Sequence, residues 1–131
     1  KGSGIAIQIV SKTTTGCFLS GNSLLQPKYV NNSKIGVEAA TQAMDVVEKE
    51  IQVKSCVGEH LSDQLLLFMC LADGISKIKI RNMRSFTSKH LKTGIHVVKQ
   101  FLPNIEITLR DCDSDGGQTQ ILTVVGVGLR Y

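Results

Sequence analysis

CVGEHLSDQLLLFMCLA at residues 56–72 and SFTSKHLKTGIHVVKQFLP at residues 85–103 are the two stretches that decide the fold. The first predicts a helix over residues 59–72 that is polar at its start and whose later turns are buried all round. The second predicts a helix over residues 88–102, which Pro103 stops. We expect these two helix starts to form one site, which the rest of the chain supports.

The other elements are predicted from the alternation and spacing of apolar residues. Strands are expected at residues 4–10, 16–20, 75–81, 105–110 and 118–125. A long helix should begin at an N-cap, Ser33, and end near Ile51. The core stripes are predicted at Val37, Ala40, Met44, Val47 and Ile51 in the long helix, and at Leu91, Ile95, Val98 and Leu102 in the last one. The order β-β-α-α-β-α-β-β lacks regular βαβ alternation and predicts a layered α+β domain.

The composition suits one domain or part of one. With 131 residues, 42% of them hydrophobic, the chain is long enough to bury a core. It contains no run of about 18 apolar residues, so we expect no membrane span. Its four cysteines lie far apart without a CxxC pair, which favours reduced thiols in an intracellular protein. The net charge of +4 is compatible with an anionic partner.

A polar cluster marks the start of the first helix. On a helical wheel, Glu59, His60, Asp63 and Gln64 fall within an arc of about 140°. Acidic residues stabilise the positive end of a helix, so capping alone would explain the cluster. The alternative is a polar site that points into a cleft or to solvent.

A histidine, His90, lies in the first turn of the other helix. The positive end of the helix dipole, together with Lys89 and Lys92, disfavours the imidazolium form. A neutral imidazole is the form that acts as a nucleophile or a metal ligand. A surface histidine near a helix cap is the plainer alternative. His96 lies about 240° further round the helix and is interpreted as structural or exposed.

Basic residues gather between the two stretches without any acidic residue among them. They are Lys77, Lys79, Arg81, Arg84, Lys89 and Lys92. This segment predicts a cationic face beside His90 for a phosphate-rich ligand, or else a solvated strand face. Downstream, residues 111–116 imitate the start of an EF-hand loop. Because the twelfth position would be Leu122, we predict a tight acidic β-hairpin instead.

GEHLSDQLLLFMCLADG followed by TSKHLKTGIHVVKQFLP resembles the C-terminal part of the RNA 3'-terminal phosphate cyclase family. The resemblance extends from the strand at Ile5 to Pro103. It implies that residues 1–131 form the C-terminal portion, one repeat, of a larger catalytic domain. It also implies an ATP-dependent ligase that converts an RNA 3'-terminal phosphate into a 2',3'-cyclic phosphate, with AMP carried on the residue that matches here, His90.

The resemblance implies roles for three further residues. Asp63 matches a carboxylate near the nucleotide and a divalent metal, Mg or Mn. Gln64 matches a nucleotide-contacting position, and His60 is expected to pack against the nucleotide where many members carry Tyr. The family's glycine-rich N-terminal segment, whose residues help to hold ATP, has no match in the chain. We therefore expect the chain to be inactive alone and to need the remainder of the cyclase polypeptide.

Two other functions stay open at this point. One is a non-catalytic cyclase-like module that binds RNA or pre-ribosomal proteins, although that branch is expected to lack the histidine. The other is a generic basic α+β binding domain. Eukaryotic-looking relatives imply a location in the nucleoplasm of the nucleus, or otherwise inside the cell.

Overall fold

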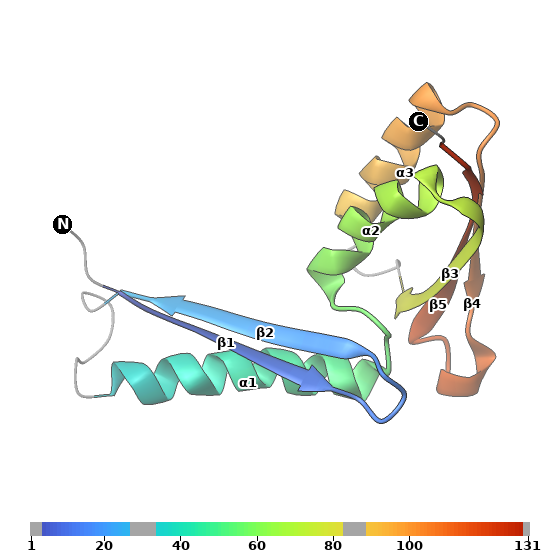
Figure 1. Cartoon of the computed structure of the whole chain (residues 1–131). Coiled ribbons are helices and arrows are strands. Elements are labelled where there is room, and N and C mark those ends of the chain that lie inside the picture. Colours follow the sequence, from blue (N-terminus) through green and yellow to red (C-terminus); the bar gives the residue numbers. More distant parts are fainter. Residues whose placement is uncertain (1–3, 27–33, 83–88, 130–131) are drawn as a thin grey trace. The chain divides into compact units, whose positions relative to one another are not determined.

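A computed structural model describes residues 4–26, 34–82 and 89–129. The chain divides into two compact units, residues 1–52 and residues 53–131. The described elements follow one another in the predicted order, as five strands in two antiparallel sheets with three α-helices (Figure 1). The predicted α+β class is therefore confirmed.

The first unit is a β-hairpin covered by one helix. Strand β1 (Ile5–Lys12) pairs antiparallel with β2 (Phe18–Leu25) over the full length of both strands. Helix α1 (Ile35–Val53) packs closely on the hairpin. A Cβ atom added to Gly21 would lie 2.0 Å from the backbone oxygen of Ala43. Only glycine allows this approach, because an oxygen of the helix backbone occupies the place of a side chain.

The buried face of α1 differs from the predicted stripe. Its buried residues are Ile35, Ala39, Ala43, Val47 and Glu50. Of the predicted residues only Val47 is buried, whereas Val37, Met44 and Ile51 are 71%, 41% and 46% exposed. The close approach at Gly21 explains the difference, because it requires small side chains on the helix face that meets the hairpin. The predicted N-cap, Ser33, lies outside the described residues.

The second unit combines a three-stranded sheet with two helices. Its elements are α2 (Glu59–Leu71), β3 (Asp73–Arg81), α3 (Lys89–Phe101), β4 (Glu106–Asp111), the 3-10 turn η3 (Asp113–Asp115) and β5 (Thr119–Val127). The strand order is β3-β5-β4, and both neighbouring pairs are antiparallel. Strands β4 and β5 are joined through η3, so the predicted acidic hairpin is confirmed.

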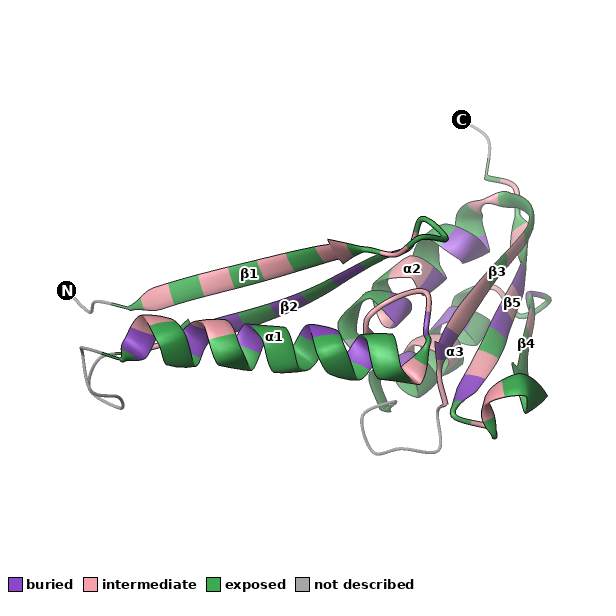
Figure 2. Ribbon diagram, turned by 90° about the horizontal axis from the view of Figure 1, so that it is seen from below, coloured by how far each residue is buried: buried purple, intermediate pink, exposed green. Residues whose placement is uncertain are grey.

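Helices α2 and α3 pack on one face of this sheet (Figure 2). The core consists of Leu66, Met69 and Cys70 from α2, Leu91 and Val98 from α3, and Ile80, Ile105, Leu122 and Val124 from the sheet side. Ile95 and Leu102 pack against this core, so the predicted stripe of α3 is confirmed. Helix α2 comes very close to β5, since a Cβ atom added to Gly126 would lie 2.1 Å from the oxygen of Ala72.

The later turns of α2 are not buried all round, contrary to the prediction. Leu67 and Phe68 are 56% and 71% exposed, while Leu66 and Met69 face the core. The helix lies on the sheet with one side only, so apolar residues off that side remain exposed. Helix α2 ends at Leu71, and β3 begins at Asp73. No described helix is long and apolar enough to cross a membrane.

Candidate functional site

The first turns of α2 and α3 lie at the same end of the second unit. The two helices run side by side in the same direction (Figure 1). They come close at Gly94, where an added Cβ would lie 3.3 Å from Cδ2 of Leu66. Gly94 is the sixth residue of α3 and Leu66 the eighth of α2, so the contact lies a similar distance from both helix starts. The polar residues of the two first turns are thus carried by packed neighbours.

His90, the second residue of α3, is exposed. The adjacent Leu91 is 4% exposed and belongs to the core, which holds this end of the helix on the unit. The imidazole therefore sits on an anchored helix while remaining accessible to a ligand. The segment before it, residues 83–88, lies outside the described residues, and it includes Arg84 of the predicted cationic face.

The residues predicted on α2 occupy different environments. His60 and Gln64 are exposed, and Asp63 is half-buried. The Oδ1 atom of Asp63 accepts a hydrogen bond from the backbone N–H of Gln64 at 2.9 Å. This bond joins neighbouring residues of α2, so it is compatible both with a role of Asp63 in stabilising the helix start and with a role in binding a ligand.

A metal at this end of the unit would have few protein ligands. No group of three or more His, Cys, Asp or Glu side chains in the described part of the chain could hold a metal ion. A single half-buried carboxylate such as Asp63 still fits Mg²⁺, which is commonly held by one or two carboxylates together with substrate phosphates and water.

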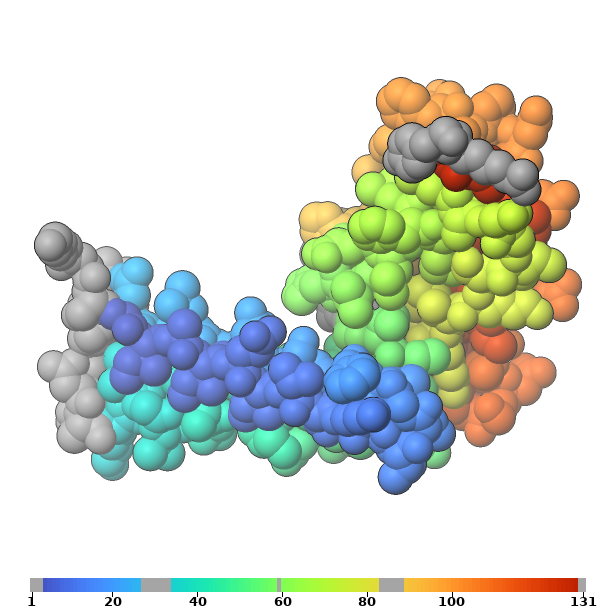
Figure 3. Space-filling model, viewed as in Figure 1, coloured from blue at the N-terminus to red at the C-terminus, as the bar shows by residue number. Residues whose placement is uncertain are grey.

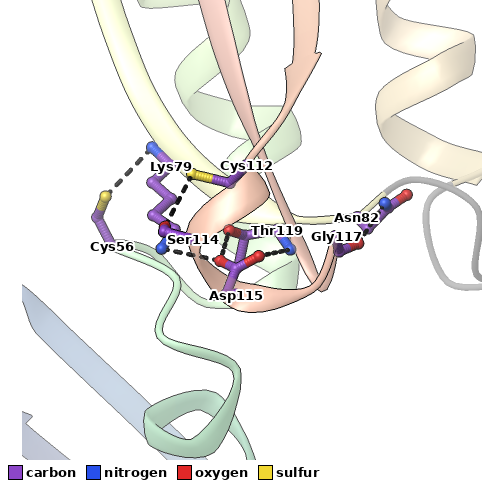
Figure 4. Close-up of polar contacts among 8 residues, drawn as sticks. All are labelled: Cys56, Lys79, Asn82, Cys112, Ser114, Asp115, Gly117 and Thr119. Atoms are coloured by element: carbon purple, nitrogen blue, oxygen red, sulfur yellow. Dashed lines mark hydrogen bonds and ion pairs between the residues drawn. The ribbon is translucent and has the colours of Figure 1, made fainter.

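The predicted cationic face is divided by the sheet. Ile78 and Ile80 point to the helices, so the alternating Lys77 and Lys79 lie on the opposite, outer face of β3. There Nζ of Lys79 lies 3.0 Å from Oδ2 of Asp115, the last residue of η3 (Figure 4). Lys79 thus serves the structure of the hairpin, and the basic residues of α3 lie on a different surface.

Asp115 is the centre of this cluster. Its carboxylate accepts hydrogen bonds from the hydroxyl of Thr119 and from Lys79, and these hold its pKa down at about 2. Conversely, the hydrogen bond to Asp115 raises the pKa of Lys79. The sequence alone did not identify this pair, because the strand register that joins residue 79 to residue 115 is not visible in it. The alternation of Lys79 with Ile78 and Ile80 was the available signal.

All four cysteines are free thiols. Cys70 is buried in the core, and burial raises its pKa. The Sγ atom of Cys56 accepts a hydrogen bond from the backbone N–H of Lys79 at 3.2 Å (Figure 4). Both environments are structural, in agreement with the prediction of reduced thiols.

Comparison with known proteins gives a consistent assignment. Residues 5–108 match the family described as RNA 3'-terminal phosphate cyclase. A probable RNA 3'-terminal phosphate cyclase of Dictyostelium discoideum is 33% identical over 96% of this chain and 28% of its own length. An RNA 3'-terminal phosphate cyclase of Desulfurococcus amylolyticus is 30% identical over 98% of this chain and 32% of its own.

A third relative, the RNA 3'-terminal phosphate cyclase of Drosophila melanogaster, is 30% identical over 76% of this chain and 24% of its own length. The chain therefore spans about a quarter to a third of the length of these curated relatives. The family match covers well over half of the chain and includes α2, α3 and the sheet residues between them. The chain belongs to the RNA 3'-terminal phosphate cyclase family.

Proposed function

We propose that this chain supplies the histidine nucleophile for ATP-dependent cyclisation of RNA 3'-terminal phosphates. The observation that carries the proposal is His90, which is exposed at the start of an anchored helix inside the matched residues 5–108. A nucleophile must be both accessible and held in position. The exposed imidazole on a helix fixed by Leu91 meets both conditions.

The chemistry proceeds in three displacements at phosphorus. A ring nitrogen of His90 attacks the α-phosphorus of ATP with its lone pair, so that a P–N bond forms and the P–O bond to pyrophosphate breaks. An oxygen of the RNA 3'-phosphate then attacks the same phosphorus, and the P–N bond breaks to return the imidazole. Finally the 2'-hydroxyl oxygen attacks the terminal RNA phosphorus, loses its proton and expels AMP, which closes the ring.

The residues of α2 are proposed to serve the nucleotide. Gln64 is exposed and offers an amide for hydrogen bonds, while His60 offers an exposed ring that packs against the nucleotide. Asp63 would hold a divalent cation, Mg or Mn, which supplies charge neutralisation for the ATP phosphates. Because α2 packs against α3, these side chains and His90 are carried on one body.

The remainder of a cyclase polypeptide is proposed to complete the site. The relatives are three to four times as long as the part that this chain matches. We infer that ATP is held mainly by residues that the chain does not contain, so the chain by itself should be inactive. We also propose that the complete protein acts in the nucleus.

Covalent labelling tests the nucleophile. The full-length polypeptide that carries this chain is incubated with α-labelled ATP and Mg²⁺ or Mn²⁺, as wild type, His90→Ala and Thr93→Ala. Thr93 is the matched control, since it is exposed on α3 one turn further on. Label should attach to wild type and Thr93→Ala, be lost in acid as P–N bonds are, and be absent from His90→Ala.

The outcomes separate the candidate functions. Undiminished label on His90→Ala would show that another residue is the nucleophile. Wild type that takes no label but binds RNA would favour the non-catalytic module. A labelled protein that fails to cyclise an RNA with a 3'-phosphate would refute the substrate and leave the adenylylation step standing.

A further inference from the structure

Helix α2 has an apolar side that is exposed. Residues 64–72, which end the helix, contain no charged residue, although only one side of α2 packs on the sheet. Leu67 and Leu71, one turn apart and outside the core side, are 56% and 43% exposed. A helix that is apolar all round is typical of the interior of a protein. The sequence of α2 therefore suits more cover than the described residues provide.

Helix α3 carries a second exposed apolar stripe. Its side chains Val97 and Phe101 are 44% and 80% exposed. At about 100° per residue they lie within about 40° of each other on the helical wheel, with His90 between them. This stripe is about 90° from the centre of the core residues Leu91 and Val98. His90 and the two apolar side chains thus share one side of α3.

The two stripes adjoin each other where the helices meet. Viewed from their N-terminal ends, two parallel helices on one sheet turn opposite sides toward each other, anticlockwise of the core residues in one and clockwise in the other. Gly94, which approaches Leu66 of α2, lies anticlockwise of Leu91 on α3. Leu67 and Leu71 lie clockwise of Leu66 on α2. Atoms of the two helices form neighbouring parts of the surface in Figure 3. We call the following four residues the apolar patch: Leu67, Leu71, Val97 and Phe101.

The apolar patch continues two stripes that begin at the candidate site. His60 precedes Leu67 by seven residues, and His90 precedes Val97 by the same number. Seven residues span about 10 Å at ~1.5 Å per residue. Because the helices run in the same direction, the histidines lie at one end of this side and the apolar patch at the other (Figure 1). A partner seated on the patch would border the site and leave His90 accessible.

The apolar patch differs from the ordinary exposed apolar residues of a protein surface. Single residues of that kind are common and need no partner. Here four side chains from two packed helices adjoin each other. The relatives indicate what covers them, because this chain matches only 24–32% of their length. Most of a cyclase polypeptide therefore lies outside the matched part and is available as the partner.

We propose that the remainder of the cyclase polypeptide packs on the apolar patch through an apolar surface of its own and so borders the site at His60 and His90. The identity of the partner rests on the proposed function, whereas the position of the contact rests on the two stripes. The contact brings the residues that complete the nucleotide site next to the first turns of α2 and α3.

Thiol labelling measures whether the patch is covered. Leu67→Cys and Phe101→Cys are introduced separately into the 131-residue chain and into the full-length polypeptide that carries it. Each protein is treated with a maleimide, and mass spectrometry of its peptides identifies the modified cysteine. Both new thiols should react in the 131-residue chain and lose most of that reaction in the full-length polypeptide, because the reagent reaches only accessible thiols.

Lys99→Cys is the matched control. Lys99 is exposed on α3 about 160° from Phe101, so a cysteine there should react equally in both proteins. The native Cys70 is buried in the core and should stay unmodified throughout, so its reaction identifies a variant that is not folded. The two patch variants lie on different helices and are assessed separately, so each remains a test if the other does not fold.

Three outcomes would overturn the contact. The first is equal reaction of Leu67→Cys and Phe101→Cys in the two proteins. The second is equal protection of Lys99→Cys, which would mean that no particular side of α3 is covered. The third is protection within the 131-residue chain, which would make a second copy the partner if it rises with concentration.

The proposed function fails separately from this contact. The labelling of His90 with AMP depends on the nucleophile, whereas maleimide labelling depends only on whether the patch is covered. A full-length polypeptide that protects the patch but takes no AMP refutes the nucleophile and retains the contact. One that takes AMP on His90 and leaves both new thiols reactive retains the function and refutes the contact.

Discussion

Two lysine-bearing surfaces of the second unit have opposite relations to their surroundings. On the outer face of β3, Lys79 is 25% exposed and is joined to Asp115, which is itself only 7% exposed. On α3, Lys92 and Lys99 stand in solvent without a carboxylate partner among the described residues. The sequence between residues 77 and 99 contains no acidic residue, yet Lys79 is half-buried in an ion pair that serves the fold, whereas Lys92 and Lys99 are exposed. Charge count alone therefore does not locate a ligand surface.

The largest effect is expected from detaching α3 from the core. Leu91 is 4% exposed and packs within the core of the second unit. Leu91→Ala should lower the free energy of unfolding by about 2–4 kcal/mol, because it removes buried methyl groups and leaves a cavity. The neighbouring Lys92→Ala should change it by less than about 0.5 kcal/mol. Urea unfolding followed by circular dichroism measures both changes. Equal effects would mean that α3 does not pack on the core through a fixed face that contains Leu91.

A smaller effect is expected from acidification of the Asp115 cluster. The Thr119 hydroxyl and Lys79 hold the pKa of Asp115 at about 2, below its ordinary value of 3.8. A lowered pKa stabilises the folded state above the ordinary value, and that stabilisation is lost as the pH falls from about 4 to about 2. The stability difference between wild type and Asp115→Asn should therefore be full at pH 7 and shrink over this range. A difference that grows on acidification would contradict the assignment.

How well each surface could be predicted from the sequence depends on how far apart in the chain its contacting residues lie. The buried face of α3 was predictable, because Leu91 and Val98 recur at helical spacing and the basic residues fall outside their stripe. The pair of Lys79 and Asp115 was not, since it depends on the register of β3 against β5 and on the η3 turn. The spacing of apolar residues shows which side of a helix is buried, but it does not show which residues of two strands lie opposite each other.

The same distinction applies to α1 and to the candidate site. Hydrophobicity favoured Met44 for the core of the first unit, but the close approach at Gly21 selects Ala39 and Ala43. The short distance between α1 and the hairpin determines which side of α1 is buried, and this distance cannot be read from the sequence. At the site, the sequence predicted two polar helix starts. Their common location depends on the packing of α2 against α3, and the reaction itself was suggested only by the resemblance.

The smallest effect is expected from Lys79 itself, because Asp115 keeps its hydrogen bond to Thr119 when the lysine is removed. Lys79→Met should lower the urea midpoint at pH 7, whereas Lys77→Met, two residues earlier on the same exposed strand face, should change stability by less than about 0.5 kcal/mol. The pairing is isolated by repeating Lys79→Met in the Asp115→Asn background, where the lysine has lost its charged partner. There the substitution should have little further effect. An undiminished loss in that background would show that the Lys79 stem, through its packing on the sheet, stabilises the hairpin without the ion pair.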